Sequence, residues 1–169
     1  PPGSGKSSLA TRVGRYCDVP VVTCAGVLER AAAEDSELGR LAKEACETNR
    51  VSDELLLALL RVRLAQGDLA AGFVLVDFPR NTGQADVVDG ILSSLGRPID
   101  AVVFVDVDGD ELMERLVGRV QCDNCGAKYN IYVNPPTVEG VCDQCGARVN
   151  RRPDDYEETI SNRLRVYEG

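Results

Sequence analysis

The main pattern in the sequence is an alternation of short apolar runs with segments whose apolar residues recur at helical spacing. The apolar runs cover residues 19–23, 72–77 and 101–107 and are rich in valine. They are apolar on both faces, which is typical of strands in a parallel sheet whose two faces are buried. Strands separated by helices predict an α/β fold, in which a parallel sheet is covered by helices.

Helices are expected between and after these runs. Ser52 is a suitable N-cap for one of them, because its hydroxyl can accept a backbone N–H at the start of the helix. Asp110 is expected to cap another. In the last helix, Ile160, Leu164 and Tyr167 lie on one side. The helical segments, in chain order, are 9–16, 27–33, 37–47, 52–60, 110–120 and 154–169.

The first eight residues, Pro-Pro-Gly-Ser-Gly-Lys-Ser-Ser, have the residue types of a phosphate-binding loop. Gly3 and Gly5 allow a tight turn that brings backbone N–H groups to anionic oxygens. Lys6 can follow the β- and γ-phosphates, and Ser7 can place a hydroxyl on Mg²⁺. The helix that follows points its N-terminal dipole at the same anion. The alternative is an ordinary glycine turn that caps a helix.

The motif G-x-x-x-x-G-K-[ST] is incomplete here, because its first glycine would precede Pro1. The strand that should lead into the loop and an initiator methionine are also missing from the sequence. We therefore expect the chain to be a fragment of a longer protein.

Length and composition restrict the number of domains, the classes of binding partner and the cellular compartment that can be expected for this protein. The chain of 169 residues is long enough for one well-packed domain with a small insertion. Its net charge of −8 disfavours nucleic acid and anionic membrane surfaces as partners. No apolar run has the length of a membrane span and no signal-peptide pattern is seen, so a cytoplasmic protein is expected.

Four of the seven cysteines form two C-x-x-C pairs, Cys122 with Cys125 and Cys142 with Cys145. Two such turns can bring four thiolates to the corners of a tetrahedron, which indicates a closed structural Zn²⁺ site, with iron as the main rival. Residues 121–151 are expected to fold around this metal as a small separate subdomain. The three isolated cysteines are expected to be buried as small hydrophobic residues: Cys17, Cys24 and Cys46.

Several arginines stand where phosphate could bind. Arg80 follows the carboxyl end of the second strand, where a guanidinium fits phosphate oxygens. Arg115 and Arg119 are four residues apart, so they share a helix face just before the cysteine subdomain, and Arg152 lies just after it. The subdomain would thus be a rigid flap with arginines at its hinges. Phosphoryl transfer requires such a flap, because water must be kept from the γ-phosphate.

A set of short motifs is spread over the whole chain. They are Gly3-Ser-Gly-Lys6, Ser36-Glu-Leu-Gly39, Asp53-Glu-Leu55, Phe78-Pro-Arg80, Gln84-Ala-Asp86, Val117-Gly-Arg119, the four cysteines around Asn134-Pro-Pro136, and Asp154-Asp155 followed by Glu157-Glu-Thr159 and Arg163. Through them the chain resembles the adenylate kinase family, in its form with a long zinc-bearing lid. The resemblance implies a P-loop fold of the nucleoside monophosphate kinase type and the reaction MgATP + AMP ⇌ 2 ADP.

The resemblance also implies a division of the chain and its cofactors. The core, with the phosphate loop, would cover residues 1–23, 53–118 and 153–169, and its C-terminal part would lie beyond the chain. Residues 24–52 would be an AMP-binding insertion and residues 119–152 the zinc-binding lid. Mg²⁺ with ATP and a structural Zn²⁺ are the implied cofactors. A monomer that acts on ATP and AMP is expected, without nucleic-acid or membrane partners.

The roles implied for single residues follow from their places in these motifs. Lys6 and Arg119 would meet the ATP phosphates, and Arg115 would stack on the ATP adenine. The whole ATP set is Gly3, Ser4, Gly5, Lys6, Ser7, Ser8, Arg115 and Arg119. The AMP set is Arg30 and Arg80 at the phosphate and Gln84 at the base, together with Val51. The catalytic set is Lys6, Arg80, Arg119, Arg152 and Arg163, with the last two closing on the transferring group. No general base is needed, because the AMP phosphate is already a nucleophile.

Three segments depart from the family's motifs. Lys6-Ser7-Ser8 replaces Lys-Gly-Thr and keeps a serine suited to Mg²⁺. The segment from Ala25 to Arg30 lacks the family's threonine and has Val27 in place of an aspartate, which removes a hydroxyl near the AMP base. Val76-Asp77 replaces Asp-Gly, so the acid moves by one residue, which reverses its facing within a strand. Asp77 could then serve Mg²⁺ only if the strand end shifts locally.

Other functions stay open at this point. The chain could be a kinase of the same fold with another monophosphate as acceptor, since Gln84 favours adenine while Ala25 removes part of that preference. It could also be a zinc-ribbon protein that binds nucleotides without turnover, as Val76 and Val27 suggest. A zinc-ribbon module for nucleic acid is a further possibility, disfavoured by the acidic charge and the lack of interleaved aromatic residues.

Overall fold

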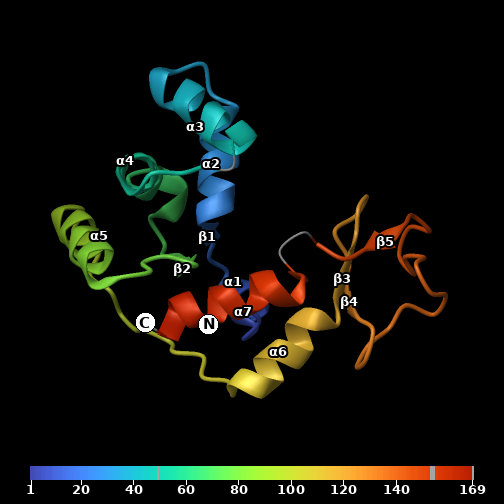
Figure 1. The fold of residues 1–169 in the computed structure, drawn as a ribbon. Coiled ribbons are helices and arrows are strands. Elements are labelled where there is room, and N and C mark those ends of the chain that lie inside the picture. Colours follow the sequence, from blue (N-terminus) through green and yellow to red (C-terminus); the bar gives the residue numbers. More distant parts are fainter. Residues whose placement is uncertain (49, 153–154, 169) are drawn as a thin grey trace. The chain divides into compact units, whose positions relative to one another are not determined.

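The computed structural model describes residues 1–48, 50–152 and 155–168, which belong to two compact units (Figure 1). The strand unit comprises Lys6–Val103. The cysteine unit comprises Pro1–Gly5 and Phe104–Gly169. Within the described residues, no helix is both long and apolar enough to cross a membrane.

The strand unit combines two short parallel strands with helices. Strand β1 (Val21–Thr23) pairs with β2 (Val74–Val76), and Val22 lies opposite Leu75. The helices are α1 (Lys6–Cys17), α2 (Cys24–Ala32), α3 (Glu37–Thr48), α4 (Asp53–Leu64) and α5 (Thr82–Ser94), with a 3-10 turn over Gly67–Leu69. Parallel strands joined through helices confirm the α/β fold expected from the apolar pattern.

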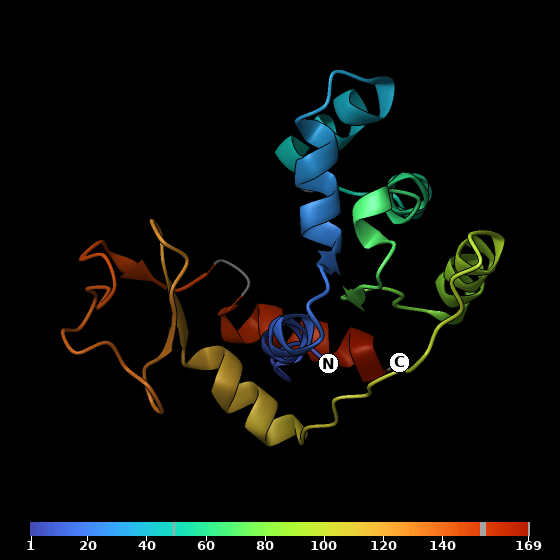
Figure 2. The ribbon, with the colours of Figure 1, turned by 180° about the vertical axis from the view of Figure 1, so that it is seen from behind.

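Leucine, valine and isoleucine side chains form the core of the strand unit. Leu60 and Leu64 of α4 are fully buried, and Val88 and Ile91 of α5 pack into the same cluster. Burying one such side chain contributes about 1.5–3 kcal/mol to folding. Helices α2 and α3 pack together in both views (Figures 1 and 2).

Side-chain caps fix where several helices of this unit begin. The Ser52 hydroxyl accepts the N–H of Leu55, which confirms Ser52 as the N-cap of α4. Thr23 and Asn81 cap α2 and α5 in the same way. Thr23 is also the last residue of β1, so it turns the chain from the strand directly into α2, whereas Asn81 starts α5 five residues after β2 ends.

The cysteine unit combines a small antiparallel sheet with two packed helices. The sheet has the order β4-β3-β5, formed by Lys128–Asn130, Arg119–Cys122 and Val149–Asn150. Helix α6 (Gly109–Val117) packs against α7 (Glu157–Glu168), as Figure 2 shows from behind. The sheet's core consists of Cys122, Cys142 and Val149 with partly buried neighbours. A core of this size needs a further source of stability.

The prediction of a third strand over residues 101–107 is wrong. The segment forms no strand, and Val102, Val103 and Phe104 are 85%, 70% and 71% exposed. A strand is stable only when its N–H and C=O groups are paired, and the described residues provide no partner strand for this segment. Its apolar sequence is typical of a buried strand, but the segment is not paired into a sheet among the described residues.

The expected helix over 110–120 is shifted. Helix α6 ends at Val117, and the chain continues from Arg119 as a strand. Its N-cap is Asp108, whose carboxylate accepts the N–H of Asp110, so the expected cap at Asp110 is wrong. The helix expected from residue 154 begins at Glu157, and residue 154 itself lies outside the described residues.

Candidate active site

The phosphate-loop motif adopts a glycine-dependent turn that leads into α1. Gly3 and Gly5 have φ values of 80° and 90°, a region that side-chain-bearing residues rarely occupy. A Cβ on Gly3 would lie 2.8 Å from Cγ of Leu116. The Ser4 hydroxyl is buried and donates to the carbonyl of Pro1 at 2.9 Å. The chain passes from the cysteine unit to the strand unit at Gly5, so the motif is divided between the two units.

Lys6 opens α1 and reaches the acid that follows β2. Its Nζ lies 3.9 Å from Oδ1 of Asp77. Both side chains are partly exposed, at 34% and 40%, so a ligand could share this charge pair. Ser7 and Ser8 lie exposed in the first turn of the same helix. Their position suits an anion or a metal at the helix N-terminus.

Asp77 adopts a backbone conformation that is uncommon for a non-glycine residue. Its φ is 68°, directly after β2 ends at Val76. Val76 is buried, so an apolar residue suits that place. Because Asp77 lies outside the strand, the alternation of facing along the strand does not fix its direction. Its carboxylate reaches Lys6.

Hydrogen bonds join Arg80 to Asp77 on one side and to Gln84 on the other. Arg80 Nε donates to the carbonyl of Asp77 at 3.1 Å, and the Arg80 backbone N–H donates to Oε1 of Gln84 at 2.7 Å. Gln84 is buried in the first turn of α5, while Arg80 is exposed. Lys6, Asp77, Arg80 and Gln84 thus form one continuous group at the carboxyl end of β2.

Cys24 belongs to this group, although its sequence position gave no sign of it. Its thiol donates to the Asp77 carbonyl at 3.6 Å. Burial raises the pKa of Cys24, although the nearby Arg80 opposes the shift. The thiol therefore stays protonated near neutral pH. Burial was expected for all three isolated cysteines, but Cys17 and Cys46 are exposed, so the expectation is wrong for these two.

Arg30 and Val51 were also expected around AMP, and neither is hydrogen-bonded to this group in the described part of the chain. Arg30 is exposed near the end of α2, and among the described residues it forms no hydrogen bond or ion pair. Val51, just before the N-cap of α4, is 40% exposed. The structure thus places these two side chains in solvent within the same unit.

In the cysteine unit, Arg119 is held by a buried carboxylate. Its Nε donates to Oδ2 of Asp155 at 2.7 Å, and a terminal nitrogen donates to the other carboxylate oxygen. Asp155 is fully buried. A bidentate pair of this kind fixes the plane of the guanidinium. Arg115 pairs instead with Glu111, one turn earlier on α6, and both of these side chains are largely exposed.

Arg115 and Arg119 line a pocket of about 250 Å³ within the cysteine unit. The other residues around it are Lys128, Tyr129, Asn130 and Asn134. Cationic groups, amides and an aromatic ring suit a ligand that carries both negative charge and a flat ring. Arg152 lies outside this pocket and lines a second hollow of about 550 Å³ with Arg151 and Lys128. Arg163 is partly buried on α7.

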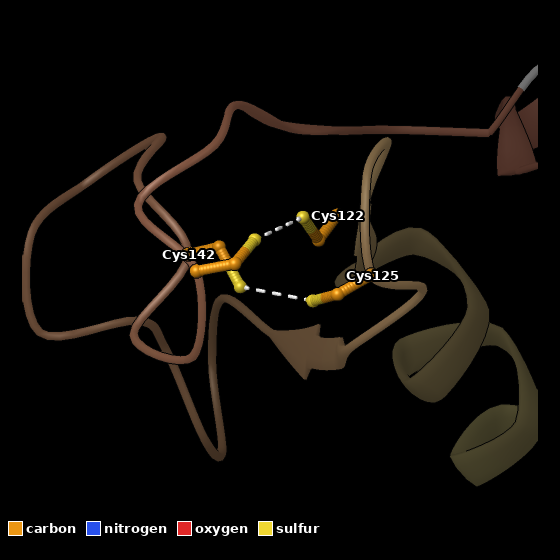
Figure 3. A group of neighbouring side chains, drawn as sticks. Cys122, Cys125 and Cys142 are labelled. Atoms are coloured by element: carbon orange, nitrogen blue, oxygen red, sulfur yellow. Dashed lines mark hydrogen bonds between the residues drawn. The ribbon is translucent and has the colours of Figure 1, made fainter.

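The four paired cysteines converge, as their spacing predicted. Their sulfur atoms all lie within 4.8 Å of one another, and the Sγ–Sγ distances are 3.4 Å for Cys122 with Cys145 and 3.5 Å for Cys125 with Cys142 (Figure 3). Sulfurs around a tetrahedral Zn²⁺ lie about 3.8 Å apart, since Zn–S bonds are about 2.3 Å long. The four sulfurs are therefore gathered at close to the spacing that a tetrahedral Zn²⁺ site requires.

The two cysteine turns have the same backbone structure. In each turn the amide of the glycine after the second cysteine donates to the carbonyl of the first, from Gly126 to Cys122 and from Gly146 to Cys142. The amide of each first cysteine donates in turn to the following alanine carbonyl, at 2.8 Å in both cases. Repetition of one turn explains how a short segment can place four sulfurs so regularly.

Hydrogen bonds give the cysteine thiols of the cluster different pKa values. The Tyr129 hydroxyl lowers the pKa of Cys142 to about 6, and the Ala147 amide lowers the pKa of Cys145. The Ala127 amide has the same effect on Cys125, but neighbouring thiols and burial outweigh it and raise that pKa to about 12. A cluster that ionises in part at neutral pH suits metal binding, because the metal displaces the remaining protons.

Comparisons with known proteins give matches over nearly the whole chain. A family model described as adenylate kinase matches residues 1–169. The adenylate kinase of Nitrosococcus oceani is 46% identical over 169 residues, which cover 99% of this chain and 78% of that protein. Those of Trichlorobacter lovleyi and Thermodesulfovibrio yellowstonii are 43% and 41% identical, over 99% and 98% of this chain and 79% and 78% of theirs.

Proposed function

Because the chain belongs to the adenylate kinase family, we propose that it is an ATP:AMP phosphotransferase, which moves the γ-phosphoryl group of ATP to AMP and yields two ADP. The observation that carries the proposal is the group at the carboxyl end of β2. There a lysine suited to the donor phosphates and an arginine suited to the acceptor phosphate share contacts with Asp77. Ligands of parallel sheets bind at this end of the strands.

The reaction needs alignment and charge rather than a proton-transfer group. Lys6 and Arg119 neutralise the ATP phosphates, and backbone N–H groups of the loop from Gly3 to Ser8 surround them. Arg115 stacks on the ATP adenine, which agrees with its place in the pocket of the cysteine unit. Arg152 and Arg163 close on the transferring group.

On the acceptor side, Arg30 and Arg80 hold the AMP phosphate, Gln84 contacts the base, and Val51 belongs to the same AMP site. Oε1 of Gln84 already accepts the Arg80 N–H, so the donor that Gln84 can offer to a base is its NH₂ group. Adenine presents an acceptor at N1, whereas guanine presents an N–H there. This geometry favours AMP over GMP.

Mg²⁺ is the cation that the family's reaction uses with ATP, and it would neutralise charge on the phosphates. Asp77 is the carboxylate of this chain that suits it. Because the chain turns at Asp77 into a left-handed conformation, the carboxylate comes near Lys6 even though it stands one residue later than the family's acid. Ser7 provides a hydroxyl from the first turn of α1.

The segments have separate roles in this proposal. Residues 1–23, 53–118 and 153–169 are the core, residues 24–52 the AMP-binding insertion, and residues 119–152 the lid. The four cysteines hold a structural Zn²⁺ in the lid, which leaves no open coordination position for catalysis. We further propose that the protein works as a cytoplasmic monomer.

One assay tests the activity. The protein is given MgATP with AMP, GMP, CMP or UMP in turn, and ADP formation is followed. We expect turnover with AMP to exceed that with the other three. Arg80→Ala should raise the KM for AMP, while Arg61→Ala, a change at an exposed arginine of α4 outside the site, should not. Measurable ATP binding without turnover of any acceptor would contradict the proposal.

A further inference from the structure

Tyr129 bridges the two cysteine turns through its hydroxyl. Tyr129 is the middle residue of β4 and is paired with Val120 of β3. The hydroxyl oxygen accepts the backbone N–H of Asp143 at 2.9 Å and lies 3.4 Å from Sγ of Cys142. A side chain from beside the first cysteine turn therefore contacts a sulfur and an amide of the second turn.

The direction of the contact with sulfur follows from the chemistry of the site. A metal-bound cysteine is a thiolate and carries no proton, so it can only accept a hydrogen bond. The hydroxyl oxygen already accepts one N–H, and its own proton is free to point to Cys142. In the metal-loaded state Tyr129 must therefore be the donor.

We propose that Tyr129 is a hydrogen-bond donor to the Cys142 thiolate which strengthens metal binding at the four-cysteine site. The inference rests on the zinc site put forward above. Four thiolates around one divalent cation carry a net charge of −2, in a chain that is itself acidic. An O–H donor withdraws charge from one sulfur and fixes its position. Groups with this role in other metal sites change metal affinity by about 10–100-fold.

The same side chain also belongs to the arginine-lined pocket. Tyr129 lines that pocket together with Arg115 and Arg119. The hydroxyl bond thus fixes one wall of the pocket as well as one metal ligand. For this reason the informative substitution is Tyr129→Phe, which keeps the ring in the pocket and removes the donor alone.

The test uses the full chain loaded with Zn²⁺ or with Co²⁺, whose charge-transfer absorption reports on the thiolates. We expect Tyr129→Phe to bind Zn²⁺ about 10-fold more weakly in competition with a chelator. Its thiolate-to-Co²⁺ band should move to lower energy, because the sulfur lone pairs lose a donor. Tyr132→Phe is the matched control, since Tyr132 lies three residues away and is 66% exposed.

A second replacement keeps the test decisive if Tyr129→Phe folds poorly. Fluorination of the Tyr129 ring at position 3 makes the hydroxyl a stronger donor with little change in shape, so the Co²⁺ band should move to higher energy. Unchanged zinc affinity and an unmoved band in both Tyr129 variants would overturn this inference alone. Failure of the unmodified protein to bind either metal would instead overturn the zinc site itself.

Discussion

At the scale of single residues, Asp77 is one of the positions where this chain departs from its family's motif. It occupies the left-handed region with a φ of 68°, and its carboxylate and carbonyl contact Lys6, Arg80 and Cys24. For a non-glycine residue this conformation costs about 1–2 kcal/mol, and less for Asp than for bulkier side chains. A residue kept in this conformation beside a lysine is best explained by a role for its carboxylate.

Two substitutions distinguish the contribution of the Asp77 carboxylate to activity from the effect of its backbone conformation on stability. Asp77→Asn keeps a side chain that tolerates the left-handed region, so stability should change little. Phosphoryl transfer should fall by about 10–100-fold, as expected for a lost metal-site group. Asp77→Gly should lose the same activity but gain up to about 1 kcal/mol of stability, because glycine adopts this conformation without strain. Urea unfolding and kcat at several Mg²⁺ concentrations check both; full activity in Asp77→Asn would contradict the role.

At the scale of elements, ion pairs with one buried partner link helices to the segments that follow or precede them. Arg63, in the last turn of α4, is nearly buried and binds Asp68 in the following 3-10 turn through two hydrogen bonds. In the cysteine unit, Arg119 and Asp155 link the start of β3 to the segment before α7. The spacing of charges in the sequence could not identify the second pair, whose partners are 36 residues apart.

The pair at Asp68 predicts a loss of stability in acid. The hydrogen bonds from Arg63 lower the pKa of Asp68 below its ordinary value of 3.8. A depressed carboxyl pKa contributes stability that is complete above the unfolded value and is lost as the pH falls through the folded one. We therefore expect stability to decline below about pH 4. Urea unfolding between pH 2 and 7 checks this, and Asp68→Asn should remove that part of the decline.

The pair at Asp155 predicts a large cost when one partner is lost. Asp155→Asn leaves the partly buried Arg119 without its anionic partner, which should destabilise the cysteine unit by about 3–5 kcal/mol. Glu111→Gln is the control, because its pair with Arg115 is exposed and should contribute less than about 1 kcal/mol. Chemical unfolding followed in both variants checks the difference, and equal effects would show that burial of Asp155 does not matter.

The elements themselves were predictable where local chemistry decides them. Ser52 was predicted to cap α4, and in the structure its hydroxyl does so, because capping depends only on residues within the first turn. The prediction of a strand over residues 101–107 failed because a strand needs a neighbouring strand to pair with, and the local sequence does not show whether one is present. Asp108 and Asp110 show the same limit on a smaller scale, since either acid could cap a helix and only the course of the chain selects one.

At the scale of the whole molecule, the two units obtain their stability differently. The strand unit buries leucine, valine and isoleucine from several helices. The sheet of the cysteine unit buries little besides two of its own cysteines and Val149. The spacing of the cysteines predicted the cluster, because two identical turns place the sulfurs by backbone geometry alone. The contacts of Cys24 and Tyr129 could not be predicted, since each depends on a distant segment.

Metal removal should therefore unfold the segment around the cysteine turns selectively. Zinc contributes about 10–16 kcal/mol to the folding of small zinc domains, which a core of this size cannot replace. After chelation, hydrogen exchange should become fast in residues 119–150 and stay slow in α4 and α5. Cys125→Ser should reproduce this loss, whereas Cys17→Ser, at an exposed cysteine outside the cluster, should not. Unchanged protection of residues 119–150 in the metal-free protein would mean that hydrogen bonds and packing alone hold the cysteine turns.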